Sequence, residues 1–101
     1  MLEFFKSKIE PNLKGFEIKY KYFEQGDFGS LVQIEFNNEL RGGEIDFWST
    51  GWLSIHLVDY IKGEAQINIF LSPNEKSEQE KMLLLLRDSL ISSGGDTKEA
   101  S

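Results

Sequence analysis

The chain has 101 residues, of which 40% are hydrophobic, and its seventeen acidic and eleven basic residues give a formal net charge of -6. This length allows one hydrophobic core but not two, and no hydrophobic run approaches the roughly 20 residues that cross a membrane, so we expect a single domain outside the membrane. The negative charge repels a phosphate backbone and attracts a basic protein, which disfavours nucleic acid as a direct partner.

The first predicted element is a short amphipathic helix that ends at Pro11. Leu2, Phe5 and Ile9 are spaced three and four residues apart, as on one face of a helix. A proline disfavours helical dihedral angles in the residue before it, so the helix is expected to stop there.

Two strands are predicted next, because the period of the hydrophobic residues changes to two. Residues 16–22 alternate between large hydrophobic residues and Glu or Lys. In the run 28–36, Val32, Ile34 and Phe36 fall on one side, and Gln33 and Glu35 fall on the other. Gln25-Gly26-Asp27 fits a turn between the two strands. The polar, glycine-rich residues 37–43 predict a longer loop after the second strand.

The clearest element is a β-hairpin with strands at residues 44–48 and 52–59. A two-residue loop would put polar residues beside hydrophobic ones on the same face of the sheet. A three-residue loop, with Gly51 in the left-handed conformation, instead pairs hydrophobic residues with each other, so we predict this loop. In this register the pairs are Ile45 with Ile55, Phe47 with Leu53, Glu44 with His56, Asp46 with Ser54, and Trp48 with Trp52.

A further strand and a second helix complete the chain. Residues 64–71 alternate, with Ala65, Ile67, Ile69 and Leu71 expected to be buried. The helix is expected to begin at either of two capping boxes, residues 72–75 or 77–80. A leucine stripe runs along it, and Ser92-Ser93-Gly94-Gly95 is expected to end it and leave residues 96–101 as a frayed tail. The stripe is formed by Leu83, Leu86 and Leu90.

These elements predict an α+β fold in one domain, residues 1–95. It consists of a single antiparallel sheet of about five strands, with a short amino-terminal helix and a carboxy-terminal helix packed on it. The carboxy-terminal helix covers one face of the sheet. The amino-terminal helix could lie on the other face, where it would turn Trp48 and Trp52 into core residues.

Catalytic and metal sites are disfavoured by the side chains available. The chain has one histidine and no cysteine, so the spaced ligand pairs of zinc sites are missing and thiolate chemistry is excluded. The best catalytic set is His56 and Ser54 with Glu44 and Asp46, but a pleated face offers them neither an oxyanion hole nor a closed cleft. We expect no enzyme, no metal and no cofactor, and keep a small hydrolase using His56 as the less favoured alternative.

The outer face of the predicted hairpin has the composition of a protein interface. It carries Trp48, Trp52 and His56 among the carboxylates of Glu44 and Asp46. Aromatic rings anchor a protein partner and the surrounding charges steer it. The sequence therefore predicts a binding face rather than an active site.

The order Arg41-Gly-Gly-Glu-Ile-Asp-Phe-Trp48-Ser-Thr-Gly51, followed by the strand at 52–59, a Gly63-Glu64 step, another strand and a leucine-rich helix, resembles a known group of proteins. These are the small immunity proteins of bacterial contact-dependent inhibition and related polymorphic toxin systems, in particular the TriTu immunity family. The resemblance covers roughly residues 28–92. It implies a cytoplasmic protein that binds and neutralises the toxic domain of a cognate effector, frequently a nuclease, without catalysis of its own.

With this resemblance, we expect a basic toxin domain as the partner. The residues expected to face it are Glu44, Asp46, Trp48, Trp52, His56 and Asp59. The loops at residues 37–41 and 59–62 are alternative contact sites, because partner-specific contacts are often carried by loops. The amino terminus lacks the pattern of a secretory signal, so we expect a cytoplasmic location. A second possible function is a small acidic chaperone for a secreted effector, which would be expected to form dimers.

Overall fold

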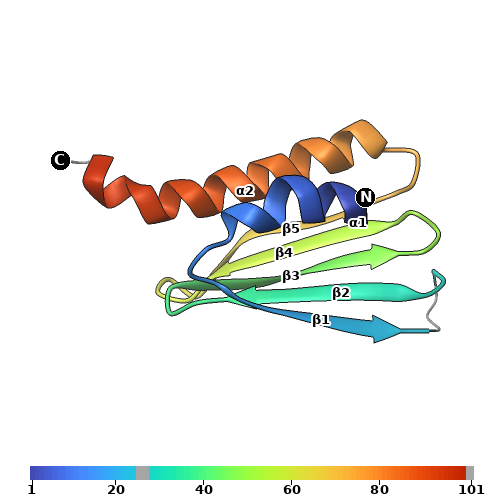
Figure 1. Cartoon of the computed structure of the whole chain (residues 1–101), viewed down its shortest axis with the longest axis horizontal. Helices are drawn as coiled ribbons and strands as arrows, with labels where there is room; N and C mark the ends of the chain where they lie inside the picture. Colours follow the sequence, from blue (N-terminus) through green and yellow to red (C-terminus); the bar gives the residue numbers. More distant parts are fainter. Residues whose placement is uncertain (25–27, 100–101) are drawn as a thin grey trace.

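The computed structural model describes residues 1–24 and 28–99 (Figure 1). Five strands form one sheet in which each strand is antiparallel to its neighbours and the order follows the chain. The predicted α+β fold with a single five-stranded sheet is confirmed. The strands are β1 (Glu17–Phe23), β2 (Leu31–Asn37), β3 (Arg41–Trp48), β4 (Leu53–Asp59) and β5 (Glu64–Leu71).

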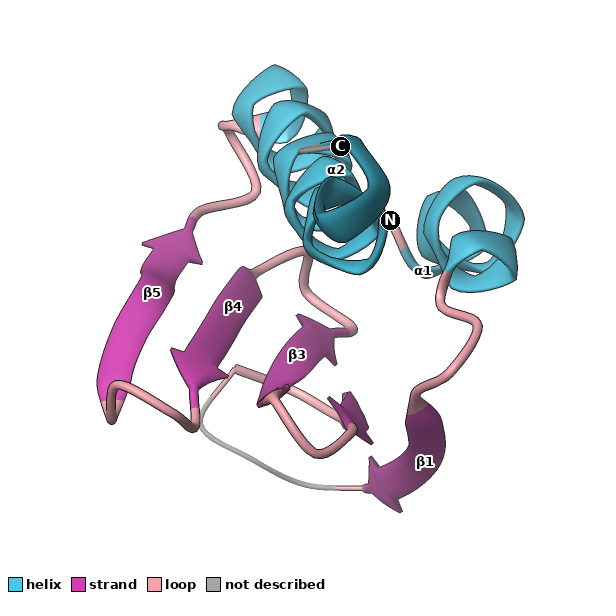
Figure 2. Ribbon diagram, turned by 90° about the vertical axis from the view of Figure 1, so that its left-hand side faces the viewer, coloured by secondary structure: helices cyan, strands magenta, loops and turns pink. Residues whose placement is uncertain are grey.

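The helices at the two ends of the chain lie on the same side of the sheet (Figure 2). The amino-terminal helix consists of α1 (Leu2–Phe4), a π-helical turn η1 (Phe5–Ile9) and a 3-10 turn η2 (Glu10–Asn12). The carboxy-terminal helix is α2 (Lys76–Glu99). We call the sheet side that carries the helices the helix face, and the opposite side, which no described helix covers, the open face.

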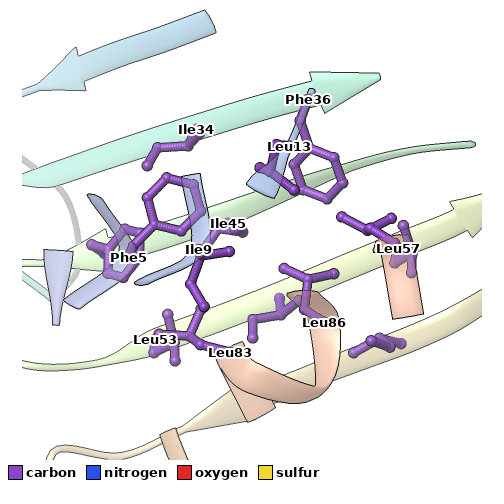
Figure 3. Close-up of a cluster of buried hydrophobic side chains, with 14 residues drawn as sticks. Phe5, Ile9, Leu13, Ile34, Phe36, Ile45, Leu53, Leu57, Leu83 and Leu86 are labelled. Carbon is purple, nitrogen blue, oxygen red and sulfur yellow. The ribbon is translucent and has the colours of Figure 1, made fainter. Parts of the chain in front are cut away.

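The core lies between the helices and the helix face (Figure 3). Every second residue of β3 and β4 points into it, as strand alternation requires. From the helices, Phe5 and Leu86 are fully buried, and the ring of Phe5 lies 5.8 Å from that of Phe47. The fully buried strand residues are Ile34, Phe36, Ile45, Leu53, Ile55 and Leu57.

The amino-terminal helix does not stop at Pro11 as expected. It continues to Asn12, because Pro11 stands in the first turn of η2, where the missing proline N–H has no helical partner to lose. The extra turn brings Leu13 into the core, where only 3% of it is exposed.

The predicted hairpin register is confirmed for β3 and β4. Ile45 pairs with Ile55 and Phe47 pairs with Leu53. The Trp48 N–H donates to the Trp52 carbonyl (3.1 Å), and Gly51, at φ 102°, donates back to the Trp48 carbonyl (2.9 Å). This is the three-residue loop with a left-handed glycine that the hydrophobic pattern required.

The expected loop at residues 37–43 is too long. β3 already begins at Arg41, and the Asn38 side-chain oxygen accepts the backbone N–H groups of Leu40 and Arg41, which closes a tight turn (2.8 and 2.9 Å). Gly42 belongs to β3. A glycine is needed at this position because the Tyr60 hydroxyl occupies the place where a Cβ would stand. Glycine here marks a close approach rather than a loop.

Other predicted boundaries shift by a few residues. The second strand begins at Leu31 rather than at residue 28. Ala65 is exposed rather than buried, because a bulge pairs it with Val58 and interrupts the alternation of β5. The predicted turn at residues 25–27 lies outside the described residues.

The ends of α2 also differ from expectation. The helix begins at Lys76, after a turn in which the Ser72 N–H donates to the Glu75 carboxylate (2.8 Å). The stop expected at residues 92–95 is wrong, because α2 continues to Glu99. A glycine costs a helix only about 1 kcal/mol relative to alanine, which does not by itself end a long helix. Residues 100–101 of the expected tail lie outside the described residues.

Candidate partner-binding face

The open face carries an aromatic cluster at the end of the sheet where β3 turns into β4. Its members, which we call the aromatic cluster, are Phe28, Trp48, Trp52 and Phe70. The rings of Trp52 and Phe70 stack at 4.9 Å and 14°, and the Phe28 ring lies 5.0 Å from Trp52 and 5.7 Å from Trp48. Phe70 remains 49% exposed. The cluster is thus a preformed, partly exposed surface.

Hydrogen bonds from the hairpin loop hold Phe28 in this cluster. The Thr50 hydroxyl donates to the Phe28 carbonyl, the Ser49 N–H donates to the Ser30 carbonyl (2.8 Å), and the Ser30 N–H donates back to the Ser49 hydroxyl (3.0 Å). The segment before β2 is therefore fastened to the loop between β3 and β4. This contact places Phe28 over the tryptophans although it lies twenty residues earlier in the chain.

A hydrogen-bonded polar group lies next to the aromatic cluster. Asp46 is only 9% exposed, and its carboxylate accepts from the Ser54 hydroxyl (2.8 Å) and from the Gln33 amide (3.1 Å). The same Gln33 nitrogen donates to Glu44 (3.1 Å). Two carboxylates thus share one amide donor at the centre of the open face.

Within this group, Glu44 is the residue whose negative charge is in an unfavourable environment. Partial burial, followed by repulsion from Asp46, raises the pKa of Glu44 above its ordinary value. Because the pKa of Glu44 is higher in the folded protein, protonated Glu44 favours the folded state and ionised Glu44 disfavours it. The free energy of unfolding therefore decreases as the pH rises through the folded-state pKa of Glu44. A positive charge brought by a partner would relieve this repulsion.

We expect Glu44→Gln to raise the melting temperature at pH 7, because glutamine removes the unfavourable charge and can still accept from Gln33. The advantage should shrink as the pH falls below the titration range of Glu44, where the wild-type side chain is itself neutral. Thermal unfolding at pH 7 and at acidic pH checks both effects. A lower melting temperature of the variant at pH 7 contradicts this account.

A hollow of about 310 Å³ lies on the open face near Gly42, towards the far end of β3 from the aromatic cluster. Glu35, Glu44, His56 and Tyr60 line it. Glu35 pairs with Glu44 across β2 and β3 and forms an ion pair with Lys21 on its other side (3.0 Å). The hollow can receive a basic side chain, since two acidic residues, Glu35 and Glu44, are among those that line it.

The structure brings five of the six predicted site residues onto one surface. Glu44, Asp46 and His56 follow the strand alternation of the open face, and Trp48 and Trp52 form half of the aromatic cluster. The face is continuous from the aromatic rings to the carboxylates.

Asp59 does not lie with the other five predicted residues. It pairs with Arg41, whose guanidinium donates to the Ser89 carbonyl of α2 (3.1 Å), so this pair is on the helix face. The Asp59 carboxylate accepts the backbone N–H groups of Ile61 and Lys62 (2.9 and 3.1 Å), and these bonds lower its pKa. Its geometry is that of a turn-forming residue.

Phe28 and Phe70 belong to the candidate surface although the sequence did not single them out. Phe70 could have been found by continuing the alternation of β5, since it pairs with Ser54 on the open face. For Phe28, the predicted alternation of residues 28–36 gave no such signal, because β2 begins only at Leu31 and Phe28 reaches the cluster through the hairpin loop.

The catalytic alternative has little geometric support. The Ser54 hydroxyl donates to Asp46 (2.8 Å) rather than to His56, which is exposed. Within residues 1–24 and 28–99, no three His, Asp or Glu side chains are placed to hold a metal ion. In the same part of the chain, no helix is long and apolar enough to cross a membrane.

Comparison of the chain with protein-family models, with curated proteins and with solved structures gave no match. The resemblance to immunity proteins therefore stays a prediction. What the chain does has to be argued from the open face itself.

Proposed function

We propose that this chain is an immunity-type inhibitor that binds a basic toxin domain, such as a nuclease, in the cytoplasm and masks its cationic surface. The observation that carries the proposal is the aromatic cluster on a sheet face left uncovered by the described helices, directly beside a row of carboxylates. The chain itself acts by binding, without chemistry.

The aromatic cluster supplies the hydrophobic part of such an interface. Contacting rings hold one another in place, so little conformational freedom is lost when a partner covers them. Aromatic residues near the centre of an interface commonly provide most of the binding energy. Phe70, half exposed, offers the partner the most accessible of these rings.

The charges of the face supply attraction and orientation. A toxin that acts on nucleic acid presents cationic groups to phosphate, and a chain of net charge -6 attracts that surface over long range. At close range the hollow beside Glu35 and Glu44 can receive an arginine or lysine. That contact would also offset the repulsion between Glu44 and Asp46.

A pair of charge-matched variants tests the proposal. The double substitution Glu35→Gln and Glu44→Gln removes two negative charges from the open face. It should slow association with a basic toxin domain, taken from a gene next to this one where such a gene is found, by about tenfold at low salt, with a smaller effect at high salt. Stopped-flow or surface-plasmon measurements give the rate.

The control carries the same change of net charge on α2, where Glu78 and Glu80 are exposed. Glu78→Gln with Glu80→Gln should alter the association rate less than twofold, because the charge lost belongs to α2, which lies on the helix face of the sheet and not on the open face (Figure 2). If both double variants slow association equally, net charge alone steers the partner and the open face is not its binding site. If the wild-type chain does not bind the toxin domain at all, the proposed function is wrong.

A further inference from the structure

The two edges of the sheet differ in a way that indicates a second contact surface. β1 and β5 are the edge strands, and each has one strand neighbour (Figure 2). β1 alternates lysines along its length, whereas residues 65–71 of β5 carry no charge and no proline. Natural edge strands are usually protected by charge or proline, because an open edge pairs readily with another strand.

We propose that the free edge of β5 pairs antiparallel with β5 of a second copy of this chain, so that the sheet continues through a symmetric dimer. The proposal is independent of the toxin partner. It concerns the regular part of β5, Ile67–Leu71, beyond the bulge that shifts the register next to Val58.

The backbone of this stretch has groups free to pair. The Trp48 N–H donates to Trp52, so the even-numbered residues of β4 direct their backbone groups towards β3, and Leu53, Ile55 and Leu57 direct theirs towards β5. Their partners in β5 are odd-numbered, which leaves the N–H and C=O groups of Asn68 and Phe70 pointing away from the sheet. The next outward residue, Ser72, has its N–H bonded to Glu75 and its carbonyl to Gln79.

A pairing centred on Ile69 uses these groups in full. Asn68 then stands opposite Phe70 of the other copy, and each such pair exchanges two backbone hydrogen bonds. On the helix face, Ile69 meets its own symmetry mate and Ile67 meets Leu71. On this face hydrophobic residues thus meet hydrophobic residues, as strand register requires.

The charge of the chain permits this contact at β5 and opposes it at β1. Residues 65–71 of both copies carry no charge, and in the Ile69-centred pairing the two copies of Glu64 are ten residues apart, about 33 Å at about 3.3 Å per residue, well beyond the screening length of about 8 Å. Two β1 strands centred on Tyr20 would instead place Lys19 directly opposite Lys21, which is unfavourable. Pairing β5 with β1 of another copy would not close and would give filaments.

The dimer would change the shape of the open face. Phe70 lies on β5, so the aromatic clusters of the two copies would come to either side of the dimer axis. A dimer could then present two adjacent aromatic clusters on one continuous sheet.

The test is the mass of the full-length chain in solution as a function of concentration, by sedimentation equilibrium. We expect dimers at about 100 μM that dissociate on dilution. Asn68→Pro deletes an outward N–H without removing a bond to β4, and should weaken dimerisation more than tenfold. Hydrogen exchange adds a local readout: the amides of Asn68 and Phe70 should become protected as the concentration rises.

Tyr22→Pro is the matched control on the other edge, because by the same alternation the Tyr22 N–H points away from β2 and its side chain is 69% exposed. It should leave the dimer intact. If Asn68→Pro does not fold, Asn68→Lys replaces it, since it brings two lysines close together across the dimer axis. A monomer at every concentration overturns the proposal, and so does a dimer that Tyr22→Pro disrupts while the Asn68 variants leave it unchanged. Neither result bears on toxin binding by the monomer.

Discussion

Replacing Trp48 and Trp52 together by alanine should weaken binding of the proposed basic partner at least a hundredfold while the protein stays folded. Interface tryptophans often contribute 2 kcal/mol or more each, and a hundredfold loss corresponds to about 2.8 kcal/mol. Folding should persist, because the two rings lie on the open face and not in the core between helices and sheet. Calorimetric titration of the partner into wild type and variant measures the difference.

The control for this experiment removes exposed hydrophobic side chains elsewhere. Leu85 and Ile91 of α2 are 48% and 45% exposed, comparable to Phe70 in the aromatic cluster. Leu85→Ala with Ile91→Ala should change the affinity less than threefold if binding uses the open face. Equal losses in the two double variants, or full affinity without the tryptophans, would show that the partner binds elsewhere.

Sequence alone predicted the part of this surface that depends on the alternation of neighbouring residues in β3 and β4. Alternation in β3 and β4 fixed which residues share a face, and the mismatch produced by a two-residue loop selected the three-residue loop. This alternation predicts Glu44, Asp46 and Trp48 on one face, and the strand register confirms it. Such assignments succeed because a strand period of two leaves only one register that buries the hydrophobic set.

The remainder depends on contacts between distant segments. Phe28 joins the aromatic cluster because the Thr50 hydroxyl bonds to its carbonyl, and the alternation predicted for residues 28–36 does not indicate this contact. The glycines of residues 37–43 predict a loop, but Gly42 lies in β3, and only the approach of Tyr60 explains a glycine there. Asp59 has the charge expected of an interface residue, but its carboxylate accepts backbone N–H groups of the turn that follows it, those of Ile61 and Lys62.

The amino-terminal helix leaves the open face uncovered only if it packs on the opposite side of the sheet. The sequence does not predict on which side it packs. The pattern of Leu2, Phe5 and Ile9 shows that one side of the helix is buried, but not against which face of the sheet. In the structure Phe5 is fully buried against Phe47, on the face opposite to Trp48. This packing keeps the helix on the helix face, and Trp48 and Trp52 remain partly exposed.

Phe5→Ala should lower the free energy of unfolding by about 3–5 kcal/mol, because it removes a large buried ring and leaves a cavity between η1 and β3. Chemical denaturation gives this value. Lys8→Ala, at an exposed position of the same helix, should stay within about 0.5 kcal/mol of wild type. The wavelength of the tryptophan emission maximum of the folded variant tests whether the helix shields the tryptophans. It should match that of wild type, because Phe5 does not cover Trp48 or Trp52. A red shift in the native Phe5→Ala protein would mean that the helix shields the tryptophans, in which case the open face is closed and the binding function assigned to it fails.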